Sequence, residues 1–311
     1  MHKICNSILE IQKSDYQTLI NDNPFMKYDF LAALESSGCA TERTGWVPNH
    51  ILNINESGKM DSFTPAYLKY HSFGEFVFDH VWVDFYNQIK FKYYPKLLIA
   101  IPFTPVRSMK ILNSGNRIFK NNQIIKNIKH FLDENNISSA HFNFIQGDEI
   151  NHLQKENFIP RVSQQYIWKN NNYSTFDDFL NTLTSRKRKM INKERKSIKS
   201  SGISIEWVDG KSISEEQIDI FYTFYLDTCN RKWGNAYLNI DFFENIISNM
   251  PDNIMLMLAK KDTSTIGASL HLKSKNTLYG RYWGANGYYK FLHYELCYYQ
   301  AIEFAIKYNL D

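Results

Sequence analysis

Apolar positions recur every second residue in some segments and about every 3.6 residues in others, which predicts alternating strands and helices. In the N-terminal half the expected strands and helices cover 4–12, 28–36, 46–54, 63–70, 97–102, 122–134 and 141–145. Turn residues at 56–59 predict a hairpin between 46–54 and 63–70. The run 97–102 is apolar throughout, as in a central strand buried on both faces. A strand pair near Phe158 and at 166–168 is expected to close this module.

Three asparagines at 170–172 interrupt the pattern and predict a domain boundary. Beyond them the pattern predicts a long helix, a strand, two helices, a three-stranded meander and a last helix, at 175–200, 203–208, 215–231, 241–250, 253–283 and 294–308. We therefore expect an α/β (α+β) protein with two domains, 1–172 and 173–311. In each, a short helix (bearing Phe30, or Phe242 and Phe243) precedes a strand, a lysine-containing turn and a second strand. This shared order indicates two copies of one module.

The last helix is followed only by residues 309–311. A helix at this position of an α/β unit normally leads back into the sheet. We expect Leu310 to be the first residue of such a strand and the second domain to be truncated.

The amino-acid composition excludes several classes of protein. The 311 residues are 43% hydrophobic and 22% charged, the balance of a soluble globular protein. Apolar runs fall far short of the roughly 18 residues of a membrane-spanning helix, and no secretion signal opens the chain, so a cytoplasmic location is expected. Four cysteines and nine histidines show no metal-ligand or disulfide spacing, so no metal is expected. The motifs G-x-G-x-x-G, G-x-x-x-x-G-K-[ST], H-E-x-x-H and G-x-S-x-G do not occur.

The net charge of +4 is too small to indicate a nucleic-acid protein, but its distribution is uneven. Residues 185–199 hold eight basic side chains and one acid on a predicted helix. Lys187 and Glu194 fall inside the apolar stripe of that helix, and Arg195 falls outside it. The pattern fits a solvated amphipathic helix, or a phosphate-binding face in which Arg186 and Arg188 clamp phosphates. Such a face could serve RNA, a nucleotide-linked precursor or an anionic membrane surface.

Three other segments carry candidate chemistry. Lys69 and His71, with Glu75 and Asp79 nearby, follow a predicted strand and are expected to form a cleft wall. Arg281 is expected on the strand face opposite Tyr282. His293 and Glu295 begin the last helix; the histidine is a candidate base, and the glutamate is either catalytic or a favourable charge near the helix start. The 22 Phe, 20 Tyr and 6 Trp predict a Tyr-rich core or aromatic-lined clefts.

The segments just named, together with the sequences at 43–46, 94–97, 101–106 and 291–303, resemble the bacterial FemAB-like family. The resemblance covers about 23–311 and implies two tandem GNAT-like domains with mixed central sheets. Fem-type relatives transfer an amino acid from aminoacyl-tRNA to the peptide of a cell-wall precursor. Acetyl-CoA enzymes of this superfamily carry [QR]-x-x-G-x-[GA], which residues 284–291 lack. That difference favours another acyl carrier.

These observations lead to the hypothesis of acyl transfer to an amine. His293 or Glu295 is the expected base, and Arg186, Lys187 and Arg188 are expected to bind phosphate. The expected lining of a cleft between the domains is Lys69, His71, Arg281 and Tyr282. The donor would be aminoacyl-tRNA or an acyl-CoA, with no tightly bound cofactor, no DNA partner and a monomeric state. The alternatives are a catalytically silent module that binds an anionic ligand, nucleotide-linked or RNA, and membrane-surface attachment through the basic helix.

Overall fold

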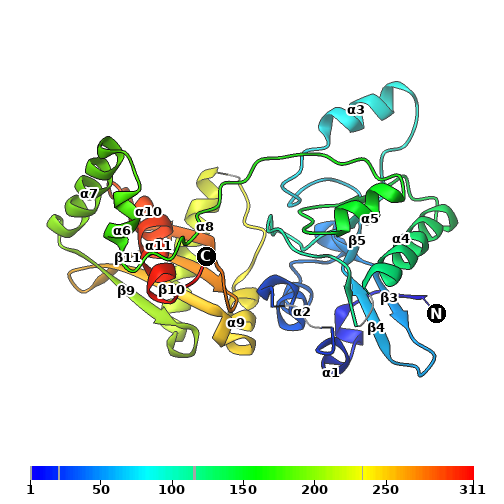
Figure 1. Cartoon of the computed structure of the whole chain (residues 1–311), viewed down its shortest axis with the longest axis horizontal. Coiled ribbons are helices and arrows are strands. Elements are labelled where there is room, and N and C mark those ends of the chain that lie inside the picture. The colour runs from blue at the N-terminus through cyan, green and yellow to red at the C-terminus, as the bar shows by residue number, and fades with distance from the viewer. Residues whose placement is uncertain (1, 20–21, 115–116, 233) are drawn as a thin grey trace. The chain divides into compact units, whose positions relative to one another are not determined.

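The computed structural model describes residues 2–19, 22–114, 117–232 and 234–311. The chain forms two compact units, Met1–Ser163 and Gln164–Asp311 (Figure 1). The division lies before the asparagines at 170–172, which were expected to mark it. The reason is that Trp168 packs into the core of the second unit, and the Asn170 backbone N–H donates to an Asp311 carboxylate oxygen at 3.0 Å. The asparagine run is therefore part of the second unit.

Unit 1 contains two small sheets. One has the order β1-β3-β4-β7 and is antiparallel; its strands are His2–Cys5, His50–Ile54, Met60–Thr64 and Leu112–Asn113. The other has the order β2-β5-β6-β8, with strands Val47–Pro48, Ala66–Lys69, Lys96–Ile99 and Ala140–Phe142. Its β6–β8 pair is parallel, so this sheet is mixed. The helices of unit 1 are α1 Lys13–Tyr16, α2 Tyr28–Ser36, α3 His80–Gln88, α4 Arg117–Glu134 and α5 Glu149–Lys155.

The predicted hairpin is confirmed, but each of its strands is divided between the two sheets. β3 and β4 pair across the turn 55–59, while β2 pairs with β5 in the other sheet. The division on the second strand falls at Pro65, between β4 and β5. Proline has no N–H for a ladder hydrogen bond, so the strand changes partners there.

Three strands predicted for this half are wrong in whole or in part. The strand expected at 4–12 ends at Cys5, because the Ser7 hydroxyl accepts from the Leu9 N–H and starts a 3-10 turn at Ile8–Glu10. The pair expected near Phe158 and 166–168 does not form: the described residues 158–175 contain no helix or strand. Val162 is 97% exposed and Tyr166 90%, so their side chains face solvent instead of a sheet neighbour.

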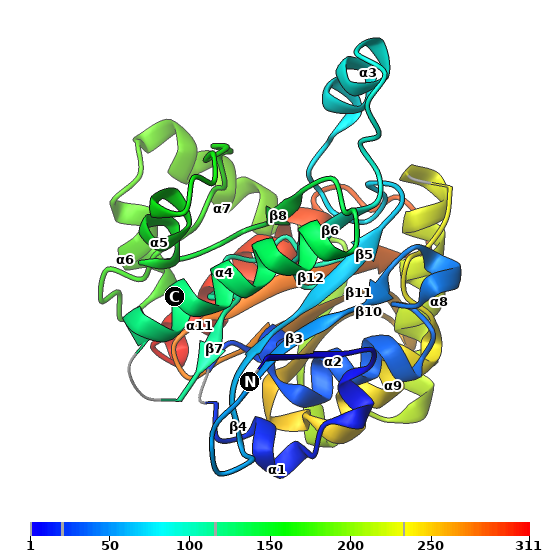
Figure 2. The ribbon, with the colours of Figure 1, turned by 90° about the vertical axis from the view of Figure 1, so that its right-hand side faces the viewer.

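The core of unit 1 lies between the mixed sheet and α4. Leu97 and Ile99 of β6 are fully buried and pack with Ile124 and Ile128 of α4 (Figure 2). The buried central strand predicted from the apolar run is therefore confirmed. Lys96, the first residue of β6, is buried together with the apolar residues of the strand.

Unit 2 has one antiparallel sheet of order β12-β11-β10-β9; its strands are Ile203–Asp209 (β9), Ile254–Lys261 (β10), Ser264–Lys273 (β11) and Leu278–Ala285 (β12). Its helices are α6 Phe176–Asn181, α7 Ser185–Ser200, α8 Glu215–Lys232, α9 Ile240–Asn249, α10 Leu292–Tyr294 and α11 Gln300–Lys307. Met257 and Leu296 belong to a core on one face, while Tyr282 packs on Phe243 of α9. The predicted meander is confirmed, and so are the α/β fold class and the order of helix, strand, turn and strand in both units.

The long helix expected at 175–200 is two helices. A capping box of Thr175 and Asp178 starts α6, which ends at Asn181. Thr184 is the N-cap of α7, and its hydroxyl accepts from the Lys187 N–H. The break arises because Thr182 and Thr184 supply local hydrogen bonds that compete with a continuous helix.

The last helix is also irregular. Between α10 and α11 the segment Glu295–Tyr299 is a π-helix. After α11, Leu310 is buried, and Asp311 exchanges backbone hydrogen bonds with Asn276 and Leu278 beside the start of β12. The strand expected from Leu310 stays a prediction.

Candidate functional site

The residues singled out in the sequence fall into one group in each unit. Lys69 and His71 belong to unit 1; the second group, all in unit 2, is Arg186, Lys187, Arg188, Arg281, Tyr282, His293 and Glu295. Their predicted roles at a cleft between domains stay predictions, so each group is described within its own unit.

Lys69 lies at the end of β5 and is completely buried. Its ammonium nitrogen is 3.8 Å from the ring centroid of Trp46 and donates to the Phe73 carbonyl at 3.3 Å. Burial lowers the pKa of Lys69 to about 7, because desolvation disfavours the charged ammonium. The cleft wall expected here is thus corrected: Lys69 is an interior group.

A second lysine, which the sequence interpretation missed, lies opposite Lys69. The register of β5 and β6 pairs Lys69 with Lys96, and two like charges face each other. The Lys96 ammonium is compensated by two buried carboxylates, Glu75 at 2.7 Å and Asp79. Burial raises the pKa of Glu75 to about 7, while Lys96 outweighs the same burial effect at Asp79 and lowers its pKa. Arg161 closes this network with a bond to the other Asp79 oxygen at 3.3 Å.

His71 is half-buried at the edge of this network. Its Nδ1 accepts from the Phe73 N–H at 3.2 Å. Gly45, at φ 71°, lets the imidazole approach so closely that a Cβ there would lie 2.0 Å from Nε2. Burial lowers the pKa of His71, so the ring is neutral at pH 7.

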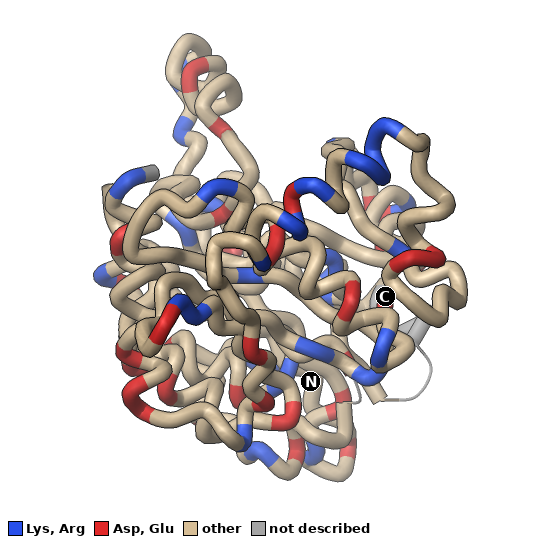
Figure 3. The backbone as a smooth tube through the Cα atoms, turned by 90° about the vertical axis from the view of Figure 1, so that its left-hand side faces the viewer, with Lys and Arg blue, Asp and Glu red and all other residues tan. Residues whose placement is uncertain are grey.

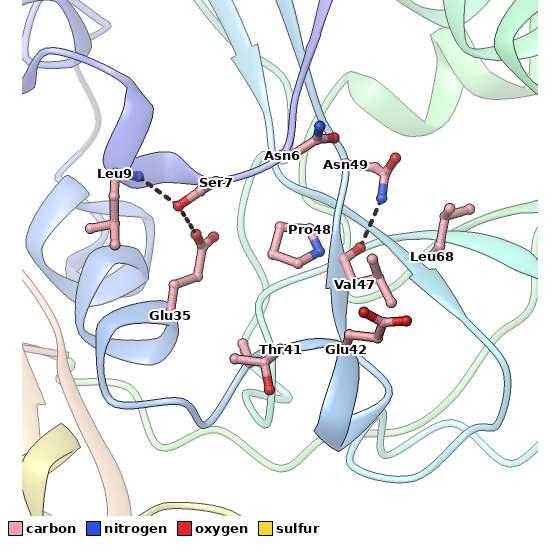
Figure 4. A pocket seen from close by; sticks show the side chains of 11 residues that line it. Asn6, Ser7, Leu9, Glu35, Thr41, Glu42, Val47, Pro48, Asn49 and Leu68 are labelled. Carbon is pink, nitrogen blue, oxygen red and sulfur yellow. Dashed lines mark hydrogen bonds between the residues drawn. The ribbon is translucent and has the colours of Figure 1, made fainter.

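One open pocket of about 430 Å³ lies elsewhere in unit 1 (Figure 4). Glu35 and Glu42 provide carboxylates on its wall, and Leu68 and Val47 an apolar side. The Glu35 carboxylate is already occupied by the Ser7 hydroxyl and by His50, each at 2.7 Å. No residue predicted for the site lines this pocket.

In unit 2, His293 lies in an aromatic lining. Its ring centroid is 4.7 Å from that of Trp283, 5.6 Å from Tyr298 and 5.8 Å from Tyr294. Both tyrosines are 51% exposed, and His293 itself is half-buried, so the lining reaches the surface. Phe291, at φ 69°, turns the chain just before α10 and sets this orientation.

Glu295 is next along the helix but is only 3% exposed. Its Oε1 accepts from Gln300 at 2.7 Å and from Arg195 at 3.2 Å. Its Oε2 has no hydrogen-bond partner among the residues that the structure describes. Glu295 is therefore an interior partner of Arg195, and the accessible one of the two predicted bases is His293.

Arg195 joins α7 to the last helix, although the sequence placed it outside the apolar stripe. It also pairs with Glu303, and its guanidinium carbon lies 4.5 Å from the ring centroid of Phe176. Desolvation alone would lower the pKa of Arg195, but the two carboxylates outweigh it and raise the pKa. Glu194 precedes Arg195 in α7, and its carboxylate accepts a hydrogen bond from the Tyr299 hydroxyl. This bond explains why the Glu194 side chain points inward.

Six cations of α7 are exposed, and we call them together the basic face: Arg186, Lys187, Lys189, Lys193, Lys196 and Lys199. Figure 3 marks the Lys and Arg positions along the backbone. Lys187, placed in the apolar stripe by the sequence, belongs to the basic face. Arg188 differs: it donates to the Asn181 side chain at 2.9 Å and to the Leu183 carbonyl at 3.4 Å, and so holds α6 to α7.

Arg281 and Tyr282 depart from their predicted geometry. A β-bulge pairs Leu270 with Tyr282 but His271 with Gly280, so the strict alternation of β12 is lost at Arg281. The Arg281 guanidinium consequently lies 5.0 Å from the Tyr282 ring centroid, not on the opposite face. Tyr282 is 9% exposed within an aromatic cluster and belongs to the core.

Three buried histidines, His50, His152 and His271, were not singled out from the sequence. His271 of β11 is 1% exposed, shares a hydrogen bond with Ser269 at 2.9 Å, and has its pKa lowered to about 4 by burial. The signal available in the sequence was a histidine within an otherwise apolar strand. Within the described ranges, no helix is long and apolar enough to cross a membrane, and no cluster of His, Cys, Asp and Glu could hold a metal ion.

Together these features define a two-unit α/β protein in which a cationic helix is joined to a helix that carries an aromatic-lined histidine. A family model described as peptidoglycan biosynthesis/recognition, that of the FemAB-like family, matches residues 7–311. The chain belongs to the FemAB-like family. A comparison with curated proteins gives no match.

Several solved structures are similar. A conserved protein of unknown function from Bacteroides thetaiotaomicron matches with a TM-score of 0.52 and 9% identity, over 99% of this chain and 88% of that one. FemX matches with a TM-score of 0.49 and 13% identity, over 87% and 79%. L-PGS from Bacillus licheniformis matches with a TM-score of 0.43 and 10% identity, over 84% and 67%. At these identities the likeness concerns the fold.

Proposed function

We propose that this chain is an N-acyltransferase that moves an acyl or aminoacyl group to an amine of a cell-wall precursor. The family description supports the acceptor class. The observation that carries the chemistry is the half-buried, surface-reaching position of His293 within its aromatic lining. An imidazole accepts protons near neutral pH, and aromatic walls reduce competition from water.

In the proposed reaction the amine nitrogen attacks the carbonyl carbon of the donor. The bond from that carbon to the carrier oxygen or sulfur breaks, the proton lost by nitrogen passes to His293, and His293 returns it to the leaving oxygen or sulfur. Glu295 is a positioning residue in this scheme, because it acts through Arg195 and Gln300 on the helix that carries the histidine. The main requirement on the protein is to orient the two reactants.

The basic face of α7 is proposed to bind phosphate of the donor or acceptor. Arg186 and Lys187 are exposed, whereas Arg188 is engaged with α6 and contributes indirectly. The absence of the pyrophosphate-binding motif at 284–291 favours aminoacyl-tRNA over acetyl-CoA as donor. No tightly bound cofactor is needed for this chemistry.

The test is transfer of a labelled amino acid or acyl group from aminoacyl-tRNA or coenzyme A thioesters to a nucleotide-linked muropeptide. His293→Ala should reduce transfer by at least about 100-fold, the usual contribution of a general base. His130→Ala is the matched control, since His130 is an exposed histidine of unit 1 that contacts Glu134 and His2. Equal activity of the two variants would overturn the role of His293.

The alternative is a catalytically silent module for an anionic ligand. The burial of Glu295 against Arg195 favours it, because one of the two predicted bases is closed off. The discriminating result is ligand binding, measured as a thermal shift, without transfer from any donor. In either case Arg186→Gln with Lys187→Gln should weaken binding and reduce its dependence on salt.

A further inference from the structure

Unit 1 carries an apolar projection built from α3 and the two chain segments that connect it (Figures 1 and 2). All of α3 is described, and none of its residues is buried. Val81 is 80% exposed, Phe85 50% and Trp82 46%. The connecting segments add the exposed side chains of Phe73, Phe76, Phe78 and Phe91. We call residues 73–92 the aromatic arm.

The aromatic arm is amphipathic. At 100° per residue, Val81, Trp82 and Phe85 fall within an arc of about 100°, and Ile89 continues the same row. His80, Asp84 and Asn87 occupy the opposite side of the helix. An amphipathic helix of a globular protein normally turns its apolar face to the core, whereas here the apolar face is exposed.

The base of the arm is held firmly. Glu75 and Asp79, within the arm, are both buried against Lys96, and the Tyr86 ring packs on Tyr93 with centroids 5.2 Å apart. The exposure of Trp82 and Phe85 is thus a feature of an anchored segment.

The charges around the arm are predominantly positive. Lys90 and Lys92 are exposed within it, and Arg161, half-exposed, donates to the Phe78 carbonyl at its base. Asp84 is the one exposed acid among residues 73–92, all of which the structure describes. Aromatic side chains bordered by lysines are the composition of helices that lie in the interface of an anionic bilayer.

We propose that the aromatic arm inserts its apolar face into the surface of an anionic lipid bilayer. The partner is a lipid surface because the arm combines exposed Trp and Phe with adjoining cations, which suit the acyl boundary and the headgroups respectively. This inference is independent of acyl transfer. It also differs from attachment through the basic face of α7, which has no comparable apolar face in contact with solvent.

The test is co-sedimentation of the full chain with vesicles of phosphatidylcholine containing 30% phosphatidylglycerol, and with phosphatidylcholine alone. Trp82→Gln with Phe85→Gln should weaken binding to the anionic vesicles about tenfold or more, since two large apolar contacts are lost. Val162→Gln, which alters a 97% exposed apolar side chain outside the arm, is the matched control and should bind normally. All three side chains are exposed enough that the thermal midpoint should not move.

Charge variants distinguish vesicle binding through the arm from vesicle binding through α7. Lys90→Gln with Lys92→Gln should weaken binding and reduce its dependence on salt, whereas Lys193→Gln with Lys196→Gln should leave it unchanged. The proposal is overturned if the α7 variants no longer co-sediment with anionic vesicles while the arm variants still do. It is equally overturned if the wild-type chain does not co-sediment with anionic vesicles. It is also overturned if the arm mediates self-association instead, seen as a dimer in sedimentation equilibrium that Trp82→Gln with Phe85→Gln dissolves.

Discussion

At the residue scale, backbone contact explains why Gly284 has no side chain. A Cβ at this position would lie 2.1 Å from the carbonyl oxygen of Phe224 in α8, and backbone cannot yield as a flexible side chain can. Gly284→Ala should therefore push α8 from β12 and lower the free energy of unfolding by about 1–3 kcal/mol or more. Urea denaturation measures this.

Gly287 provides the matched control for this substitution. Its Cβ would meet only Tyr289, at 3.8 Å, an ordinary contact. Gly287→Ala should change the free energy of unfolding by about 0.5 kcal/mol at most. Equal effects of the two alanines would show that α8 does not pack on β12 as described.

The buried imidazole of His271 makes a second prediction at this scale, on pH. Its pKa is lowered by burial to about 4 in the folded chain, against about 6.5 in the unfolded chain. Between these values the unfolded chain binds a proton that the folded chain does not, so stability falls as pH falls. From pH 7 to pH 5 this single group should cost about 2 kcal/mol.

His141, whose pKa burial also lowers to about 4, acts in the same direction, so the wild-type slope alone cannot isolate His271. His271→Gln can keep a hydrogen bond to Ser269 and removes the titration. The free energies of unfolding of wild type and variant should converge as pH falls from 7 to 5. Parallel curves over this range would refute the assignment.

At the element scale, Arg195 makes the junction between α7 and the last helix. It is 16% exposed and pairs with Glu295 and Glu303. Arg195→Met would leave the buried Glu295 carboxylate without its cation, and the free energy of unfolding should fall by about 3–5 kcal/mol. Lys196→Met, one residue along and exposed, should be nearly neutral.

A double-mutant cycle measures the interaction between Arg195 and Glu295. Adding Glu295→Gln to Arg195→Met removes the uncompensated charge and should recover part of the loss, with a coupling energy of about 1–3 kcal/mol. Strictly additive losses would mean that the two side chains do not interact.

The sequence predicted most elements because their apolar periods are strong. The run at 97–102 and the meander of unit 2 could be interpreted locally, since strand burial leaves a direct pattern in the residues. The break between α6 and α7, the π-helix at Glu295–Tyr299 and the bulge at Arg281 were not predictable in this way. Each depends on one or two hydrogen bonds or on a register set by a neighbouring strand.

The candidate site was predictable only in part, for a related reason. His293 and the basic face of α7 are recognisable from residue type and spacing alone. The pairing of Lys69 with Lys96, 27 positions later, depends on strand register, and the burial of Glu295 depends on Arg195, 100 positions earlier. Long-range partners decide whether a charged side chain is interior or accessible, and a single sequence does not contain them.

At the scale of the whole molecule, the junction between the units governs how the chain can be cut. Residues 158–175 contain no helix or strand, and Tyr166 is 90% exposed. This stretch is anchored on one side by Arg161, bound to Asp79 in unit 1, and on the other by Trp168, packed in unit 2. Between these anchors the chain is exposed, with Val162 97% and Tyr166 90% exposed, and an exposed segment without helix or strand is where a protease cuts first.

Chymotrypsin at a low ratio to the native chain should therefore cut first after Tyr166, leaving fragments 1–166 and 167–311. Each unit has its own core, so both fragments should resist further digestion for longer than the intact junction does. The exposed Phe73 and Phe78 are competing sites, but the arm that carries them is fixed by Glu75 and Asp79, so cleavage there should be slower. Mass spectrometry of the first products identifies the position of the first cut. The substitution Tyr166→Ser should delay the appearance of these products. A first cut inside α4 or the sheet of unit 2 would mean that the cores, and not the junction, open first.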